Sequence, residues 1–176
     1  FGDQDQLYLN VGAGNFVDVS ATHLPQGRTF SNGAAFAPAT TTLAVPMLIR
    51  GFANNLPPEV LLGNGQGQFL TSLPAFATAL SAGRIVARDV NGDQRPDVVV
   101  EDLRHLTPTA PPVLVFLNNG TNQFPGLGRS NAPGGNTSGF ALADFNGDNL
   151  PDLLINYTAG GQTLLLNTGL GQFVAQ

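Results

Sequence analysis

Two acidic segments of the chain have the same residue types at the same spacing. The first reads DVNGDQRPDVVV (89–100) and the second reads DFNGDNLPDLLI (144–155). In each, Asp, Asn, Asp and Asp occupy the first, third, fifth and ninth positions, and the main-chain carbonyl of the seventh residue is a further oxygen donor. The donors expected in the first segment are Asp89, Asn91, Asp93, the carbonyl of Arg95, and Asp97. Those expected in the second are Asp144, Asn146, Asp148, the carbonyl of Leu150, and Asp152.

Oxygen donors at this spacing are typical of a calcium site. Ca²⁺ takes about six to eight oxygen ligands, whereas Mg²⁺ keeps several waters and a stricter octahedron. Zn²⁺ would prefer His or Cys, and neither residue lies in the two segments. Three carboxylates this close also repel one another unless a cation lies between them. Asn, Gly and Asp are common turn residues, so one copy alone would fit a plain turn. Two copies favour a Ca²⁺ site in each.

The two segments lie at equivalent places in a repeat. Four stretches align without gaps, each with an apolar run, a Gly-containing turn and a Phe. They are LYLNVGAGNF (7–16), VLLGNGQGQF (60–69), VFLNNGTNQF (115–124) and LLLNTGLGQF (164–173), spaced 49 to 55 residues apart. This period suits one blade of a β-propeller, because blade repeats run to about 40–50 residues.

Each full unit contains four short runs that we interpret as strands. In the last unit they are 139–143, 152–157, 162–167 and 171–176, and in the unit before it 84–88, 97–102, 113–118 and 123–126. We therefore predict an all-β fold, a partial β-propeller of about three and a half four-stranded antiparallel blades. The single repeat domain (1–176) divides into a half-blade (1–25), a blade with a degenerate metal loop (26–76), and two blades with calcium loops (77–130 and 131–176).

The second unit keeps the strand but loses the acids. Residues 33–49 align without gaps to 139–155, and this alignment puts Pro38, Thr40, Thr42 and Pro46 at the four side-chain ligand positions. We therefore expect two Ca²⁺ ions in the chain and none in this unit.

These motifs resemble the FG-GAP/VCBS repeats, the blades of propellers like that of the integrin α-subunit. The resemblance covers essentially the whole chain, and residues 7–25 are similar to bacterial secreted members. It implies Ca²⁺ binding in the hairpin between the first and second strands of a blade, and a role in binding or adhesion. Family loops commonly have Gly at the sixth position, where this chain has Gln94 and Asn149. Gln adopts a left-handed backbone less readily than Asn, so we expect the 89–97 site to be the weaker.

The composition argues against several functional classes. The formal net charge is −5 and the chain has no Lys, whereas nucleic-acid binding requires a basic surface. There is no Cys, and no apolar run reaches the roughly 18 residues of a membrane span. Neither His23 nor His105 accompanies a nucleophile motif. We interpret Glu101 and Asp102, beside Arg104, as a solvated strand end and not as a catalytic pair.

We therefore expect a non-catalytic protein, extracellular or on the cell surface, that binds a protein or, less readily, a glycan. Glycan binding is the weaker option because Tyr and Phe are the only aromatic residues. The alternatives are a structural subunit of an extracellular assembly or filament, and an accessory region of a larger secreted enzyme. The start at Phe1 favours a processed product or a piece of a longer chain. We expect the open edges at 7–10 and at the 139–143 or 171–176 strands to pair with neighbouring subunits or with further blades of the parent chain.

Overall fold

The computed structural model describes residues 4–27, 30–38, 45–104, 110–126, 128–130 and 132–176. This part of the chain is built almost entirely from strands and contains one short helix, α1 (Ser20–His23). Gly and Pro together number 35 in the chain, and they end the apolar runs after a few residues because neither continues a helix or a central strand well. Short strands joined by turns are the result.

The strands form four antiparallel sheets, and each sheet joins strands that follow one another in the chain. The first sheet has two strands, β1 (Tyr8–Gly12) and β2 (Asn15–Asp18). The second contains β3 (Ser31–Ala37), β4 (Met47–Phe52), β5 (Glu59–Leu62) and β6 (Thr71–Leu73). The third contains β7 (Ala82–Arg88), β8 (Asp97–Asp102), β9 (Val113–Phe116) and β10 (Gly128–Arg129). The fourth contains β11 (Thr137–Ala143), β12 (Asp152–Tyr157), β13 (Gln162–Asn167) and β14 (Phe173–Ala175). The prediction of an all-β, antiparallel fold is confirmed.

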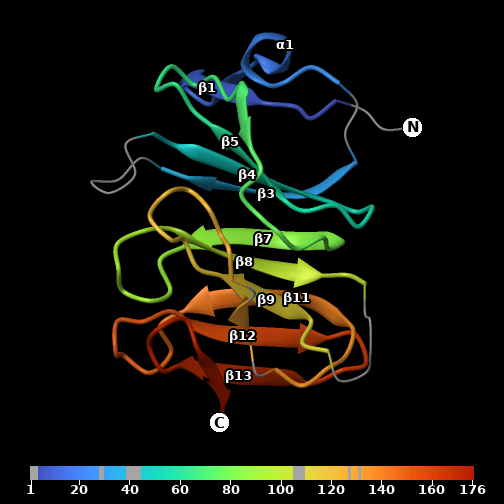
Figure 1. The fold of residues 1–176 in the computed structure, drawn as a ribbon, viewed down its shortest axis with the longest axis vertical. Helices are drawn as coiled ribbons and strands as arrows, with labels where there is room; N and C mark the ends of the chain where they lie inside the picture. Colours follow the sequence, from blue (N-terminus) through green and yellow to red (C-terminus); the bar gives the residue numbers. More distant parts are fainter. Residues whose placement is uncertain (1–3, 28–29, 39–44, 105–109, 127, 131) are drawn as a thin grey trace.

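The sheets are stacked in chain order along the long axis of the molecule, with the first hairpin at one end and the fourth sheet at the other (Figure 1). Glycines allow β3 and β4 to lie close against β7. A Cβ atom on Gly33 would lie 2.0 Å from the carbonyl oxygen of Gly83. A Cβ atom on Gly51 would lie 2.3 Å from that of Ala82. The second and third sheets therefore pack at a distance that only glycine permits at these positions.

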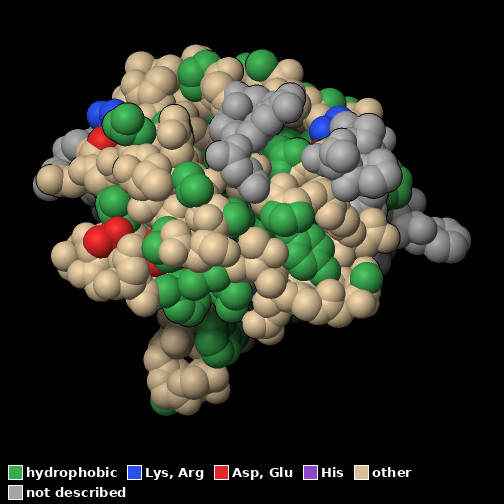
Figure 2. Space-filling view, turned by 90° about the horizontal axis from the view of Figure 1, so that it is seen from below, with side chains coloured by type: hydrophobic (Ala, Val, Ile, Leu, Met, Phe, Trp, Pro, Cys, Tyr) green, Lys and Arg blue, Asp and Glu red, His purple; other side chains and the backbone are tan. Residues whose placement is uncertain are grey.

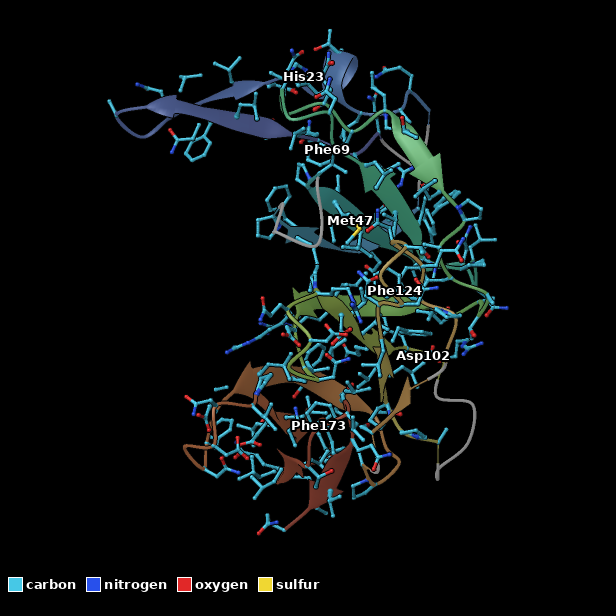
Figure 3. All side chains as sticks on the ribbon, turned by 60° about the vertical axis from the view of Figure 1, so that its left-hand side comes forward. His23, Met47, Phe69, Asp102, Phe124 and Phe173 are labelled. Atoms are coloured by element: carbon cyan, nitrogen blue, oxygen red, sulfur yellow. The ribbon has the colours of Figure 1, made fainter. Side chains whose placement is uncertain are left out.

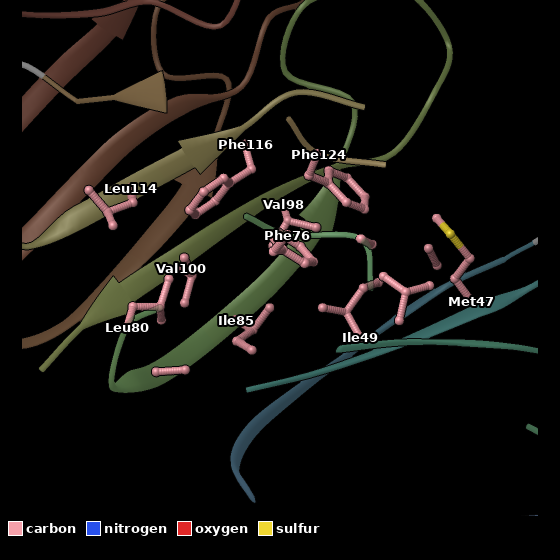
Figure 4. Close-up of a cluster of buried hydrophobic side chains, with 14 residues drawn as sticks. Met47, Ile49, Phe76, Leu80, Ile85, Val98, Val100, Leu114, Phe116 and Phe124 are labelled. Carbon is pink, nitrogen blue, oxygen red and sulfur yellow. The ribbon is translucent and has the colours of Figure 1, made fainter. Parts of the chain in front are cut away.

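Two apolar clusters fill the spaces between the larger sheets. The cluster between the second and third sheets contains three Phe rings (Figure 4). Phe76 stacks on Phe124 with 4.6 Å between ring centroids and meets Phe116 edge-on at 5.2 Å. The cluster between the third and fourth sheets includes Val99, Val115, Phe140, Leu165 and Phe173. Both clusters thus contain the Phe that ends the repeated motif.

The fourth strand of the third sheet lies later in the chain than the sequence predicts. The expected strand was 123–126, whereas β10 is Gly128–Arg129, with Gly128 opposite Val115. Phe124 instead forms a parallel bridge with Phe76 and donates its N–H to the carbonyl of Ala75 at 2.8 Å. After the turn, the chain therefore first hydrogen-bonds to the segment that connects the second and third sheets. It pairs with β9 only further along the sequence.

The degenerate segment of the second sheet is one residue longer than a gapless alignment allows. Ala37 pairs with Met47 in the same register in which Ala143 pairs with Asp152. Met47, not Pro46, therefore stands at the ninth position, where its buried side chain replaces a carboxylate. Of the other aligned positions, Pro38 is described, and Thr40 and Thr42 lie outside the described residues.

Charged side chains are sparse on the surface. Figure 2 shows the end of the molecule formed by the fourth sheet, where hydrophobic and uncharged polar atoms cover most of the face. In the described part of the chain, no helix has the length and apolar character needed to cross a membrane.

Candidate metal-binding loops

The two acidic segments form loops at the same place in two sheets. The first loop connects β7 to β8, and the second connects β11 to β12. Equivalent strand pairs close them, with Arg88 opposite Asp97 and Ala143 opposite Asp152. The ninth position of each loop is thus also the first residue of a buried strand.

Each loop folds around its first Asp. The carboxylate of Asp89 accepts three backbone N–H groups at 2.7–3.1 Å, from Asn91, Gly92 and Gln94. The carboxylate of Asp144 accepts three at 2.7–3.2 Å, from Gly147, Asp148 and Asn149. The identical pattern of residue types therefore gives nearly the same turn in both places.

The third and fifth positions extend this network. The side-chain amide of Asn91 donates to Asp93 at 3.0 Å, and that of Asn146 donates to Asp148 at 2.8 Å. The side-chain oxygens of Asn91 and Asn146 accept the N–H of the fifth residue at 3.1 and 2.9 Å. Asp93 and Asp148 in turn accept the N–H of the seventh residue at 2.9 and 2.8 Å. The loop's own main chain thus orients these side chains.

The sixth position of each loop has a left-handed backbone. The φ angle is 65° at Gln94 and 69° at Asn149. Asn visits this region several times more often than other non-glycine residues, so Gln94 carries the greater backbone strain. This difference agrees with the expectation from the family pattern that the first loop is the less favourable of the two.

The Asp at the ninth position ties each loop to the third strand of its sheet. Asp97 is fully buried, and its two oxygens accept the N–H of the second loop residue at 3.0 Å and that of Asn118 at 2.8 Å. Asp152 is equally buried and accepts the corresponding N–H groups at 2.9 Å and, from Asn167, at 2.8 Å. Each carboxylate oxygen still has a free lone pair for a further partner.

Asn118 and Asn167 complete this connection, and the sequence analysis missed both. Each is 3% exposed, and their side-chain amides donate to the carbonyls of Pro96 at 3.2 Å and Pro151 at 3.0 Å. The amide of Asn167 also donates to the carbonyl of Val90 at 2.8 Å, which links the fourth sheet to the first acidic loop. The available signal was an Asn after the apolar run in three of the four repeated motifs.

Two carboxyl groups of the loops have shifted pKa values. Burial raises the pKa of Asp97 to about 6, and the negative charges of Asp93 and Asp89 raise it further. Two backbone hydrogen bonds to the carboxylate act in the opposite direction. Asp144 is exposed, and hydrogen bonds from the backbone, first of all from Asn149, lower its pKa. A cation beside Asp97 would offset the unfavourable free energy of a buried, ionised carboxylate.

Arg95 distinguishes the first loop from the second. Its guanidinium Nη2 lies 2.6 Å from Oδ2 of Asp93, with 33% and 23% of the two side chains exposed. The seventh residue of the second loop is Leu150, which has no charge. One of the candidate ligands of the first loop is therefore already paired with a cation.

The donor chemistry fits a hard cation, although the carboxylates are not gathered around one point. In the described part of the chain, no group of three or more Asp, Glu, His or Cys side chains is placed to hold a metal ion. Their oxygens are instead directed to backbone N–H groups, as described above. Each loop nevertheless offers three carboxylates, an amide oxygen and main-chain carbonyls, which are the ligand types of Ca²⁺.

Glu101 and Asp102 are not a solvated strand end. Both are 7% exposed. Glu101 accepts hydrogen bonds from the hydroxyl of Thr137 and from the N–H of Arg84, so it joins the third sheet to the fourth. Asp102 is paired with Arg104 at 2.6 Å. The prediction of solvation was wrong because the pattern of one strand does not reveal the sheet that covers it.

Comparison with known proteins does not assign a family. No protein-family model matches the chain. No curated protein has a significantly similar sequence. The resemblance to FG-GAP/VCBS repeats therefore rests on the motifs in the sequence.

Proposed function

We propose that this chain is a non-catalytic, calcium-binding repeat protein. The observation that carries the proposal is the equivalence of the two acidic loops, which have the same ligand types, closely similar internal hydrogen bonds and the same place in two sheets. The corresponding place in the second sheet has a buried Met47 instead of a carboxylate. At this position the second sheet therefore lacks the carboxylate that both acidic loops have.

The sheets are, in this proposal, blades of a partial β-propeller of the FG-GAP/VCBS type. Three four-stranded antiparallel meanders and one hairpin, stacked in chain order, support this interpretation. They amount to about three and a half blades, fewer than the roughly four to eight of closed propellers.

The ligands proposed for Ca²⁺ are the donors predicted from the sequence. In the second loop they are Asp144, Asn146, Asp148, the carbonyl of Leu150, and Asp152; in the first they are Asp89, Asn91, Asp93, the carbonyl of Arg95, and Asp97. A bound Ca²⁺ would supply positive charge that offsets repulsion among the three carboxylates. The chain's own residues orient the donors through the hydrogen bonds of each loop. We assign the higher affinity to the second loop because Arg95 competes for Asp93 in the first.

The proposed setting is extracellular or at the cell surface, and the proposed activity is binding of a protein or, less readily, a glycan. Extracellular modules bind Ca²⁺ with Kd of about 10⁻⁴–10⁻³ M, which suits small, exposed loops of this kind. The alternative, that the chain is an accessory region of a larger secreted enzyme, predicts the same Ca²⁺ binding.

A structural subunit of an extracellular assembly is the second candidate. The observation that favours it is the exposure of four large apolar side chains on one hairpin, Tyr8, Val11, Phe16 and Val17. Apolar side chains that are exposed together can mark an interaction surface.

Calorimetric titration with Ca²⁺ tests the proposal. We expect a stoichiometry near two, with the tighter site lost in Asp144→Ala and the weaker site lost in Asp89→Ala. A folded protein that takes up no Ca²⁺, or one whose titration is the same in both variants, would refute the assignment.

Arg95→Leu provides a sharper version of this titration. Partly exposed ion pairs contribute about 0.2–1 kcal/mol, so removal of the competing guanidinium should tighten the weaker site by up to about fivefold. Arg88→Leu is the matched control, because it removes one positive charge next to the loop without breaking the contact to Asp93.

A further inference from the structure

The hairpin β1–β2 has the geometry of the outer half of a complete sheet. Asn10 pairs with Phe16 in the same register in which Asn167 pairs with Phe173. Its turn residues (12–14) have φ angles of 98°, 51° and 76°, and the corresponding residues of the β13–β14 turn have 84°, 55° and 69°. The hairpin is therefore equivalent to the third and fourth strands of the fourth sheet.

The surfaces that are covered in the complete sheets are exposed in the hairpin. Tyr8 and Phe16 are 49% and 62% exposed, whereas their counterparts Leu165 and Phe173 are fully buried. Figure 3 shows the hairpin extending away from the rest of the molecule. In the fourth sheet, β12 pairs with the edge of β13 that corresponds to the free edge of β1. Among the described residues, the first sheet has no equivalent of β12.

Asn10 indicates what the missing strand must provide. Its side-chain oxygen accepts the N–H of Gly12 at 2.9 Å, as the oxygens of Asn118 and Asn167 accept the equivalent N–H groups at 2.9 and 3.0 Å. The turn thus holds all three Asn side chains in the same way. In the third and fourth sheets, the backbone N–H of this Asn donates to an Asp carboxylate and its amide to the preceding carbonyl. Asn10 is exposed and faces no such partner among the described residues.

A hollow lies where the missing strands would pack. Its volume is about 290 Å³, and its lining includes Leu7 at the start of the hairpin and Ala34 and Leu48 of the second sheet. By strand register, Ala34 corresponds to Ile85 and Phe140. These two side chains are 6% and 2% exposed because they pack against the preceding sheet. Ala34 is exposed, so the second sheet lacks that neighbour.

We propose that the hairpin β1–β2 binds a two-stranded β segment of the same repeat type that is not among residues 1–176. The second strand of this segment begins with an Asp and pairs antiparallel with the free edge of β1. Its Asp carboxylate accepts the N–H of Asn10, and the carbonyl before that Asp accepts the side-chain amide. Its apolar residues cover Tyr8, and its first strand fills the hollow beside Ala34.

A second copy of the chain has no such segment available. The three candidates, β3–β4, β7–β8 and β11–β12, are each hydrogen-bonded to the third strand of their own sheet. A copy could donate one of them only by opening that sheet and exposing its apolar core. The proposed segment therefore comes from elsewhere, and its binding does not require Ca²⁺ in either acidic loop.

A synthetic peptide of residues 137–157 is the probe, because it contains a first strand, an acidic loop and a second strand that begins at Asp152. Hydrogen exchange of the intact 176-residue protein with this peptide, in a chelator, should show protection of residues 7–12, greatest at Asn10. Hydrogen bonds to charged groups contribute about 1.5–3 kcal/mol. The peptide variant Asp152→Ala should therefore bind at least about tenfold more weakly. The protein variant Asn10→Ala keeps its backbone N–H and loses only the amide bond to a neutral carbonyl, worth about 0.5–1.5 kcal/mol, so it should bind about two- to tenfold more weakly. Asn54→Ala, at an exposed loop position, should bind like the parent protein.

Two results would overturn the inference. One is an absence of protection at 7–12, or equal binding of the parent peptide and its Asp152→Ala variant. Because the second comparison changes only the peptide, misfolding of the protein cannot account for its result. The other is self-association of the protein alone that protects 7–12, which would make a second copy the partner. Because the chelator removes Ca²⁺, the outcome of this experiment does not depend on whether the calcium proposal is correct.

Discussion

Carboxylates in one loop can have separate structural and ligand roles. Asp152 is fully buried and accepts two backbone N–H groups, so it fastens the loop to the third strand of the sheet. Asp148 is exposed and bonds only within its own loop. The same residue type thus fastens the loop to the sheet in one position and makes hydrogen bonds only within the loop in the other.

We predict that Asp152→Ala destabilises the protein even without Ca²⁺. Each buried N–H left without an acceptor costs about 1–3 kcal/mol, so the free energy of unfolding in a chelator should fall by about 2–5 kcal/mol. Asp148→Ala, the matched control, should change it by less than about 1 kcal/mol while weakening Ca²⁺ binding. Chemical denaturation of both variants provides the measurement, and equal stabilities would show that Asp152 has no structural role.

At this scale the sequence predicted the positions of the two acidic loops but not their surroundings. The spacing of Asp, Asn and Asp was sufficient to place each loop between two strands. The contacts of Asn118 and Asn167 were not predictable from spacing, because they depend on which loop lies next to the end of the third strand. Glu101 likewise lies in an apolar strand, and only the position of Thr137 on the next sheet explains its burial.

At the scale of elements, glycine determines how closely two sheets approach. Gly33 of β3 lies against the main chain of Gly83 of β7, and neither can give way without moving a strand. A flexible side chain at the contact could adjust, but a carbonyl oxygen in a ladder cannot. The packing of the second sheet on the third therefore depends on the absence of a single methyl group.

Gly33→Ala should separate these two sheets. Overpacking of this kind costs about 1–3 kcal/mol, and the loss should appear as a lower denaturation midpoint and as faster hydrogen exchange in β3 and β7. Gly126→Ala is the control, since a Cβ there would meet nothing within 4 Å, and it should change stability by less than about 0.5 kcal/mol. If Gly33→Ala proved as stable as the control, β3 and β7 would not pack as closely as described.

The strands were predictable where the repeat is regular and were misplaced where it is not. In the fourth sheet the period of apolar runs gave all four strands to within a few residues. In the third sheet, the bond from Phe124 to Ala75 delays the last strand beyond 123–126. In the second, an extra loop residue moves Met47 into the position that the alignment gave to Pro46. Local pattern cannot reveal either event, because each depends on a partner elsewhere in the chain.

For the whole molecule, bound Ca²⁺ should add stability without being required for folding. The second sheet forms with Met47 at the position of the ninth-residue Asp, and hydrogen bonds from the main chain to the Asp side chains hold each acidic loop. At about 1 mM Ca²⁺ and a Kd of about 10⁻⁴–10⁻³ M, each site contributes about 0.4–1.4 kcal/mol.

Removal of Ca²⁺ should therefore lower the melting temperature by about 2–10 °C for two sites in a chain of this size. Scanning calorimetry with and without chelator provides the measurement. Asp144→Ala, which removes the tighter site, should abolish more than half of the shift, and Mg²⁺ at the same concentration should restore less of it. A melting temperature indifferent to chelator would contradict the proposal that Ca²⁺ binds the folded form.

The meander order of the sheets has a consequence for the timing of folding. Because every named sheet joins strands that are consecutive in the chain, each pairing closes only a short loop, and such local contacts form quickly. During synthesis, the sheet β3–β6 can assemble before the strands of the next sheet have left the ribosome, since domains and their parts fold as they emerge at about 5–20 residues per second. Each finished sheet then offers its apolar face to the one that follows. If synthesis pauses when residues up to 73 have emerged and β7 is still inside the ribosome, the strands of the second sheet can pair while Ile49 and Val60 lack the cover of β7.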